Sequence, residues 1–244
     1  SGASFVRHRV EFNYHAGDYD RAQAAFGEAA VPTYITFGNH DYRGPGEKNL
    51  IDVFTRRLWP LNHAFTLGGI EFINLDTAAN TLPFSAGNRG RLLNQLSASR
   101  PGVRQRIAFY HRPLIDPRDK PEGGNAHDIG GLGEGRWLHQ RLRKLGVDTA
   151  LNGHIHMKLE FDDEGLFTYI SGQGLAHADV INQKMRPMAQ ILLGDVTPNE
   201  STNFQWAALE MPLLAHCNER LKKILEKSGR GDLTKALEQM CRHS

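Results

Sequence analysis

Three short segments of the chain carry side chains that can bind a metal ion or move a proton. They are Gly38-Asn39-His40-Asp41, Tyr110-His111-Arg112-Pro113 and Gly153-His154-Ile155-His156. Each segment follows an apolar run that is typical of a buried strand. An amide oxygen and several imidazoles together suit a hard or borderline divalent metal. The first hypothesis is therefore hydrolytic chemistry at a metal centre.

The first segment combines three kinds of chemistry. The side-chain oxygen of Asn39 can bind a metal without adding charge. His40 would then lie beside the metal, where it could stabilise a phosphoryl oxygen or donate a proton to a leaving group. Asp41 could accept a proton from one ring nitrogen of His40 and fix its tautomer. The alternative is a polar turn, because Gly, Asn, His and Asp are common in turns.

The other two segments supply histidines. In an extended chain His154 and His156 would point to the same side and could serve two adjacent metals. A polar rim without metal is the alternative. His111 taken alone is as compatible with a structural role, and Pro113 fits a strand that stops sharply.

The elements between these segments alternate between helix and strand. We expect helices over Tyr19–Ala30, Asn49–Leu58, Arg89–Ser97 and Arg136–Leu145. We expect strands over Pro32–Phe37, Ile70–Leu75, Arg106–Tyr110 and Asp148–Leu151, and late strands over Gln190–Val196 and Phe204–Met211. Hairpins are expected at Leu67–Gly69 and Asp162–Gly165, and a long loop over Arg112–Gly135. This order favours a layered α/β sandwich. The carboxyl ends of strands meet at one rim of such a sheet, where sites form.

Size and charge exclude some functions. A net charge of +2 over 244 residues is too small to indicate nucleic acid or an anionic membrane as a partner. No apolar stretch approaches the roughly 20 residues that span a bilayer. The oligomeric state is not indicated.

Two cysteines, Cys217 and Cys241, lie on the helices expected over Leu213–Lys227 and Leu233–Arg242. They are symmetric about the turn between these helices, so a disulfide could clamp the helical hairpin. A disulfide would indicate an exported protein, periplasmic or secreted. Two separate thiols would instead fit the cytoplasm.

The order of the three segments resembles the calcineurin-like metallophosphoesterase family. The signature of that family includes GNH[D/E], a single later His and GHxH. The resemblance extends from about Asp18 to Gly174 and includes the hairpin that ends in Ile70–Thr77. It is similar to family members with a core of the purple acid phosphatase or cyclic-nucleotide phosphodiesterase type.

The resemblance implies an αββα sandwich and a role for each matching residue. It implies that Asn39, His111 and His154 bind one metal, that His156 binds the other, and that His40 is the proton donor or charge stabiliser. Two divalent metals, Mn, Fe or Zn, would be the cofactors. The reaction implied is hydrolysis of a phosphomonoester or phosphodiester by metal-activated hydroxide.

Arg43 is a further candidate for the site. It follows the first segment closely, and a guanidinium can contact the phosphate of the substrate.

The chain departs from the family pattern in its first part. The DxH and GDxxD motifs of the family are not legible, and no Asp-x-His precedes Asn39. Asp18 and Asp20 fit the cap and first turn of a helix better than a metal site. His8 and His15 are equally weak substitutes. We therefore expect an atypical or incomplete amino-terminal part and one weakened metal site. Only one metal would then be bound, or the activity would be impaired.

Two units and two functions are predicted. Residues 1–211 would form the metallophosphoesterase-like domain, and residues 212–244 a C-terminal helical hairpin. The predicted function is a metal-dependent phosphoesterase. The alternative is a degenerate, weakly active or inactive member that acts as a binding or scaffold protein. A non-haem iron site ranks last, because the spacing of a facial triad is absent.

Overall fold

The computed structural model describes the central part of the chain. The described residues are 24, 27, 33–39, 41, 47–78, 88–118, 128–129, 132–155, 157–172, 188–197 and 200–210. Residues 24 and 27 are helical, as expected for Tyr19–Ala30. The helical hairpin over 212–244, with Cys217 and Cys241, lies outside the described residues, so the hairpin, the disulfide and the division into two units stay predictions.

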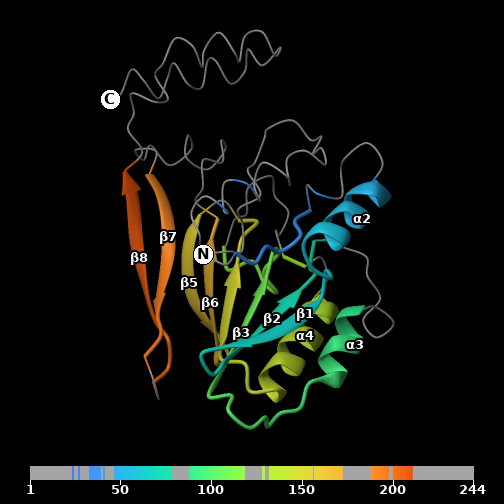
Figure 1. The fold of residues 1–244 in the computed structure, drawn as a ribbon. Helices are drawn as coiled ribbons and strands as arrows, with labels where there is room; N and C mark the ends of the chain where they lie inside the picture. Colours follow the sequence, from blue (N-terminus) through green and yellow to red (C-terminus); the bar gives the residue numbers. More distant parts are fainter. Residues whose placement is uncertain are drawn as a thin grey trace, which may run out of the picture.

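A six-stranded sheet is the centre of the described structure (Figure 1). Its strands, in spatial order, are β1 (His63–Leu67), β2 (Ile70–Leu75), β3 (Gln105–Tyr110), β4 (Thr149–Asn152), β6 (Leu166–Ser171) and β5 (Lys158–Asp163). The four inner strands are parallel, and the two edge strands are antiparallel to their neighbours. The carboxyl ends of β2, β3 and β4 therefore share one rim.

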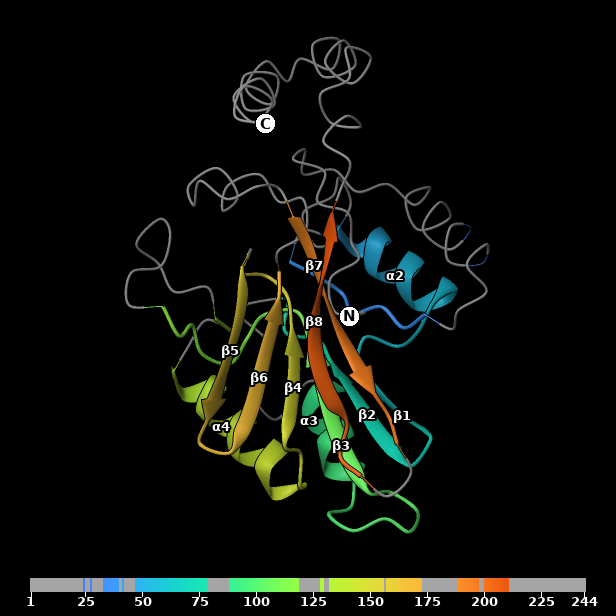
Figure 2. The ribbon, with the colours of Figure 1, turned by 90° about the vertical axis from the view of Figure 1, so that its left-hand side faces the viewer.

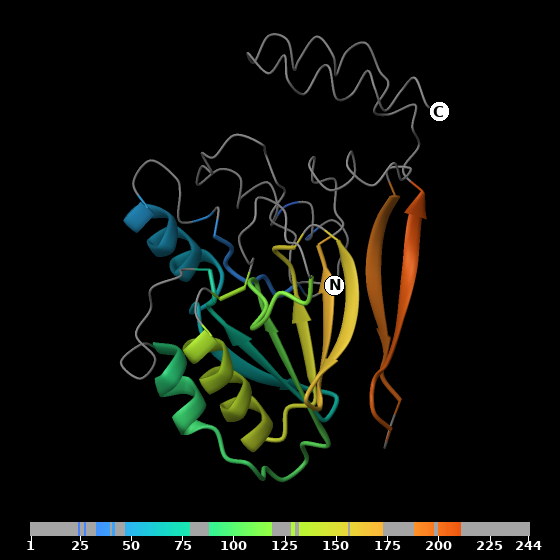
Figure 3. The same ribbon diagram turned by 180° about the vertical axis from the view of Figure 1, so that it is seen from behind.

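The sheet lies between two different layers. Helices α3 (Asn88–Gln95) and α4 (Leu132–Lys144) cover one face, and an antiparallel pair, β7 (Met188–Asp195) and β8 (Asn203–Glu210), lies on the other (Figures 2 and 3). Tyr169 of β6 packs on Phe204 of β8 with 4.9 Å between ring centroids. This sequence of layers confirms the predicted layered α/β fold.

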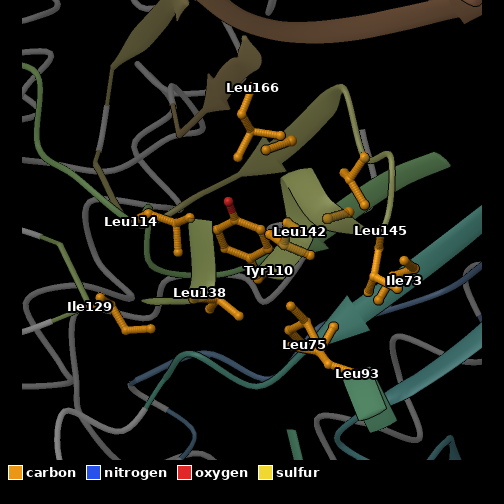
Figure 4. Close-up of a cluster of buried hydrophobic side chains, with 13 residues drawn as sticks. Ile73, Leu75, Leu93, Tyr110, Leu114, Ile129, Leu138, Leu142, Leu145 and Leu166 are labelled. Carbon is orange, nitrogen blue, oxygen red and sulfur yellow. The ribbon is translucent and has the colours of Figure 1, made fainter. Parts of the chain in front are cut away.

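The main core fills the space between the sheet and its helices. It is an apolar cluster of buried side chains around Tyr110, which lies among Leu138, Leu142 and Leu166 (Figure 4). Every residue of β3 is buried, which fits the apolar run Ile107–Tyr110 at its carboxyl end. The central strands that carry the site are thus fixed on both faces.

Both predicted hairpins form, and glycine makes each turn possible. Gly68 and Gly69 join β1 to β2 with φ of 57° and 78°, and Glu164-Gly165 joins β5 to β6 with φ of 47° and 87°. Two consecutive positive φ values define the turn whose twist matches that of the flanking strands.

The strand predicted over Pro32–Phe37 is not confirmed. Residues 33–38 are described but belong to no strand, because they form no ladder with other described residues. Side-chain packing holds them instead. Phe37 meets Phe54 of α2 (Glu47–Arg57) edge to face at 5.1 Å, and Tyr34 stacks on Phe65 of β1 at 3.9 Å.

The long loop predicted over Arg112–Gly135 ends earlier than expected, because α4 begins at Leu132. Glycines in this stretch suggested a loop. Gly135 is instead required by packing, since a Cβ there would lie 2.6 Å from the carbonyl oxygen of Leu114. In the same first turn Glu134 forms a buried ion pair with Arg89 of α3, which fixes the two helices to each other.

No helix in the described ranges combines the length and apolar character needed to cross a membrane.

The opposite rim of the sheet is held by a buried ion pair. The carboxylate of Glu71 is fully buried and lies 2.7 Å from Nε of Arg106 and 2.5 Å from Nη1 of Arg100. Arg106 also donates to the carbonyl oxygens of Ser97, Ala98 and Leu145. Each nitrogen of this guanidinium donates to at least one acceptor, on β2 or in the segments that follow α3 and α4, so its charge is compensated.

Two substitutions around this carboxylate should differ strongly. Glu71→Ala would leave the guanidinium of Arg106 buried without its counter-ion, and we expect a loss of about 3–5 kcal/mol in the free energy of unfolding. Arg100→Ala removes a partner that is half exposed, and we expect a loss below about 1 kcal/mol. Urea denaturation measures both. Equal losses would show that burial of the pair does not decide its energy.

His63 of β1 lies among aromatic rings. Its Nδ1 donates to the carbonyl oxygen of Pro60 at 2.8 Å, and its buried Nε2 has no hydrogen-bond partner in the described structure. Trp59 and Phe65 stack near it at 5.9 and 6.0 Å. Burial lowers the pKa of His63 below its usual value, against the opposing effect of the Pro60 carbonyl. The folded protein therefore favours the neutral ring.

This burial predicts a loss of stability in mild acid. When the pH falls through the pKa of the unfolded ring, about 6.5, the unfolded chain takes up a proton that the folded chain resists. The stabilisation that the fold gains from the neutral, buried ring of His63 is thus complete above that pH and is lost as the pH falls below it. Between about pH 7.5 and about pH 5.5, the unfolding free energy of the wild type should fall more than that of His63→Gln. Parallel profiles in urea denaturation would contradict the expectation.

Candidate metal centre

Three side chains from distant parts of the chain meet at one rim of the sheet. Asn39 follows residues 33–38, His111 follows β3, and His154 follows β4. Nε2 of His111 lies 2.7 Å from Oδ1 of Asn39, Nδ1 of His154 lies 3.1 Å from the same oxygen, and the two ring nitrogens are 3.2 Å apart. We call these three residues the rim cluster. The structure thus brings together residues separated by more than a hundred positions.

A tight turn carries Asn39. The main-chain N–H of Gly38 donates to Oδ2 of Asp41 at 2.7 Å, and the N–H of Asp41 donates to the carbonyl oxygen of Gly38 at 3.0 Å. A Cβ at Gly38 would come within 3.2 Å of Oδ2 of Asp41 and 3.3 Å of Cε1 of His111. Glycine therefore lets the turn press against the histidine ring. The buried Asp41 closes this turn, which agrees with the polar turn considered for this segment from the sequence.

His111 is held by bonds to the chain on either side of β3. The hydroxyl of Thr77, just beyond β2, donates to the carbonyl oxygen of Arg112 at 3.1 Å and accepts the N–H of Arg112 at 2.8 Å. On the other side the N–H of Gly153 donates to the carbonyl oxygen of His111 at 3.1 Å. The exposed fraction of His111 is only 5%, so its ring has little freedom to turn away.

His154 has an unusual main-chain conformation. Its φ is +64°, in the left-handed region that side chains other than glycine seldom adopt. The N–H of Ile155 reaches the carbonyl oxygen of Gly153 at 2.7 Å, which bends the chain around His154. Such strain persists only where the surroundings impose it, and it concentrates at functional sites.

The chemistry of the rim cluster fits a cation. Amide oxygen and unprotonated imidazole nitrogen are acceptors, so their lone pairs repel unless ring protons or a cation lie between them. Neighbouring ligands of one metal ion, with bonds of about 2.1 Å, are roughly 3.0–3.4 Å apart. The distances of 2.7, 3.1 and 3.2 Å lie close to this range. The residues present therefore fit a divalent metal at this position, although their role as ligands remains a prediction.

The other predicted site residues are not among the described residues. His40, Arg43 and His156 lie outside the described residues, as do the weaker candidates at the amino terminus. Within the described ranges no group of three or more His, Cys, Asp or Glu side chains could hold a metal. The donor groups of the rim cluster are two imidazoles and one neutral amide.

Sequence inspection missed the residues that support the rim cluster. Thr77 binds the main chain of Arg112, and Asn152 donates to the carbonyl oxygen of Tyr110. Such bonds leave no spacing pattern in a single sequence. The one available signal was their position at or just beyond strand ends.

The fold and the rim cluster define an α/β protein with a candidate metal centre at the carboxyl ends of its strands. Residues 8–158 match the family model described as calcineurin-like phosphoesterase. Because this match covers more than half of the chain, the protein belongs to the calcineurin-like phosphoesterase family, one of metal-dependent hydrolases. The resemblance seen in the sequence is thereby confirmed.

Several solved structures are similar to the chain. GAP50 of Plasmodium, the anchor in the inner membrane complex, is 17% identical, with 58% of this chain and 49% of that chain covered and a TM-score of 0.43. The purple acid phosphatase PPD1 of yellow lupin seeds is 18% identical, with 57% and 28% covered and a TM-score of 0.38. Vacuolar protein sorting 29 of Cryptosporidium parvum is 15% identical, with 78% and 76% covered and a TM-score of 0.32. The chain spans less than half of the first two, and no curated protein matches it.

The strain at His154 can be measured in the metal-free protein. His154→Gly and His154→Ala both remove the ring, but only glycine adopts φ of +64° without a steric cost. We expect the glycine variant to be about 1 kcal/mol more stable than the alanine variant in urea denaturation. An alanine variant of equal or greater stability would show that the left-handed conformation imposes no strain.

Proposed function

We propose that the protein is a metal-dependent phosphoesterase that hydrolyses a phosphomonoester or a phosphodiester. The observation that supports this function best is the meeting of Asn39 Oδ1, His111 Nε2 and His154 Nδ1 within 3.2 Å. It occurs in a chain that belongs to a family of phosphoesterases. Family membership and the chemistry of the donors thus point to the same reaction.

The proposed roles divide the site into metal ligands and groups that act on the substrate. Asn39, His111 and His154 would hold one cation, and His156 would contribute to the second. Divalent metals bound there would activate water and neutralise the charge of the phosphate. Manganese, iron and zinc are the candidate ions.

The chain itself would manage the proton and the phosphate. We propose that His40 donates a proton to the oxygen of the leaving alcohol, which would otherwise depart as an unstable alkoxide. Asp41, the next residue in the sequence, would orient the ring of His40. Arg43 would bind a phosphate oxygen through its guanidinium.

The reaction can be tested with a generic substrate. After removal of metal, the protein is assayed on bis(4-nitrophenyl) phosphate and on 4-nitrophenyl phosphate with Mn²⁺, Fe²⁺ or Zn²⁺. We expect metal-dependent release of nitrophenol that falls by about 100-fold or more in His154→Ala, because a ligand of the metal is lost. The two substrates distinguish diesterase from monoesterase activity.

A matched histidine controls for general damage. His139 on α4 donates to the carbonyl oxygen of Asp163 at 2.7 Å and belongs to no part of the rim cluster, so His139→Ala should keep the activity. No rate above background with any metal, or an unchanged rate in His154→Ala, would defeat the enzymatic proposal. Elemental analysis that finds no metal in protein purified without chelators would then favour the binding or scaffold role.

A further inference from the structure

We infer that Asn152 is a positioning residue that holds the ends of β3 and β4 so that the ring nitrogens of His111 and His154 meet. This inference rests on the proposed function, because it gives the rim cluster the role of binding a metal. It concerns a residue that neither touches the cluster nor belongs to the motif that predicts it.

Asn152 is the last residue of β4 and pairs in register with Tyr110, the last residue of β3. Its exposed fraction is 1%. Its amide Nδ2 donates to the carbonyl oxygen of Tyr110 at 3.0 Å, and the next main-chain N–H, that of Gly153, donates to the carbonyl oxygen of His111 at 3.1 Å. The last carbonyl of β3 and the carbonyl that follows it are therefore bound by two consecutive residues, Asn152 and Gly153.

A main-chain ladder would not make both bonds. Successive carbonyls of an extended strand point toward opposite neighbours, so the main chain of one neighbour engages only alternate ones. The side chain of Asn152 supplies the missing donor at the point where β3 ends and His111 begins. The direction in which each strand leaves the sheet is thus fixed immediately before each histidine.

This placement matters because the rim cluster depends on short distances. The two ring nitrogens are 3.2 Å apart, and a shift of one strand end by about 1 Å would separate them beyond the spacing of ligands on one ion. Partners that orient metal ligands without touching the metal are worth roughly 10- to 100-fold in metal affinity.

The side chain of Asn152 also acts on Tyr110 itself. Its Oδ1 is buried and makes no hydrogen bond within the described residues, whereas interaction of the amide with the Tyr110 hydroxyl opposes the rise in the pKa of that hydroxyl that burial causes. The bond from Nδ2 to the carbonyl oxygen of Tyr110 gives the buried amide a partner on the neighbouring strand.

Asn74 on β2 provides a matched control. It too is buried, and its Oδ1 also has no partner in the described structure. Its Nδ2 donates to the carbonyl oxygen of Leu61 at 3.2 Å and lies 3.3 Å from Nδ1 of His63. Leu61 does not adjoin a member of the rim cluster. Asn74→Leu therefore reproduces the loss of a buried amide without loosening β3 from β4.

The test compares Asn152→Leu and the smaller Asn152→Ala with Asn74→Leu and the wild type. Binding of Co²⁺ alone is followed by visible absorption and by competition with a chelator, and the unfolding midpoint is measured in urea. Ring signals of His111 and His154 are recorded by NMR in the metal-free proteins. We expect Asn152→Leu to bind Co²⁺ roughly 10- to 100-fold more weakly and to shift both ring signals, whereas Asn74→Leu does neither.

The outcomes separate the inference from the function on which it rests. Wild-type affinity and unshifted ring signals in a folded Asn152 variant would overturn the positioning role, as would an equal loss of affinity in Asn74→Leu. Failure of the wild type to bind Co²⁺, with ring signals that still shift in Asn152→Leu, would overturn the metal site while supporting the effect of Asn152 on the histidines.

Discussion

The structure of the site depends on holding three lone-pair acceptors in contact. An amide oxygen and two imidazole nitrogens within 3.2 Å of one another repel unless protons or a cation separate them. A ring N–H of either histidine can donate to the Asn39 oxygen, so hydrogen bonds can hold part of this arrangement without a metal. The surrounding main chain sets where the three side chains meet, and most of the polar contacts at this rim of the sheet can be understood as doing so.

Each member of the rim cluster is fixed by a different device. Asn39 lies in a turn closed by Asp41, His111 is held through its neighbours by Thr77 and Gly153, and His154 is bent into a left-handed conformation. All three devices bind main-chain groups rather than the ring nitrogens and the amide oxygen of the rim cluster. The positions of the side chains are therefore set through the main chain, which is the requirement for a preorganised site.

The sequence predicted the chemical groups of the rim cluster better than their supports. Asn39, His111 and His154 could be found because each follows an apolar strand-like run, and parallel strands bring such ends to one rim. Thr77 and Asn152 could not, since a bond from a side chain to a distant main-chain carbonyl has no local pattern. The start of α4 was misplaced for a related reason, because Gly135 is needed for contact with Leu114 rather than for a turn. Residues 33–38 look like a strand in composition, yet strand formation also requires a partner ladder, which apolar residues alone do not specify.

The two rims of the sheet are built on opposite principles. At the amino-terminal rim, Glu71 and Arg106 satisfy one another and nearby carbonyls almost completely, so the polar groups there stabilise a fixed geometry. At the carboxyl-terminal rim, His154 is strained and Asn152 keeps a buried oxygen without a partner in the described structure. Local conformations of this kind persist where the rest of the fold over-determines them. The packed core around Tyr110 lies between the two rims. The favourable free energy of the ion pair at the amino-terminal rim can therefore offset the unfavourable free energy of the strained conformations at the rim that carries the candidate metal centre. Departures from local rules are expected at functional positions, and here they gather around the histidines.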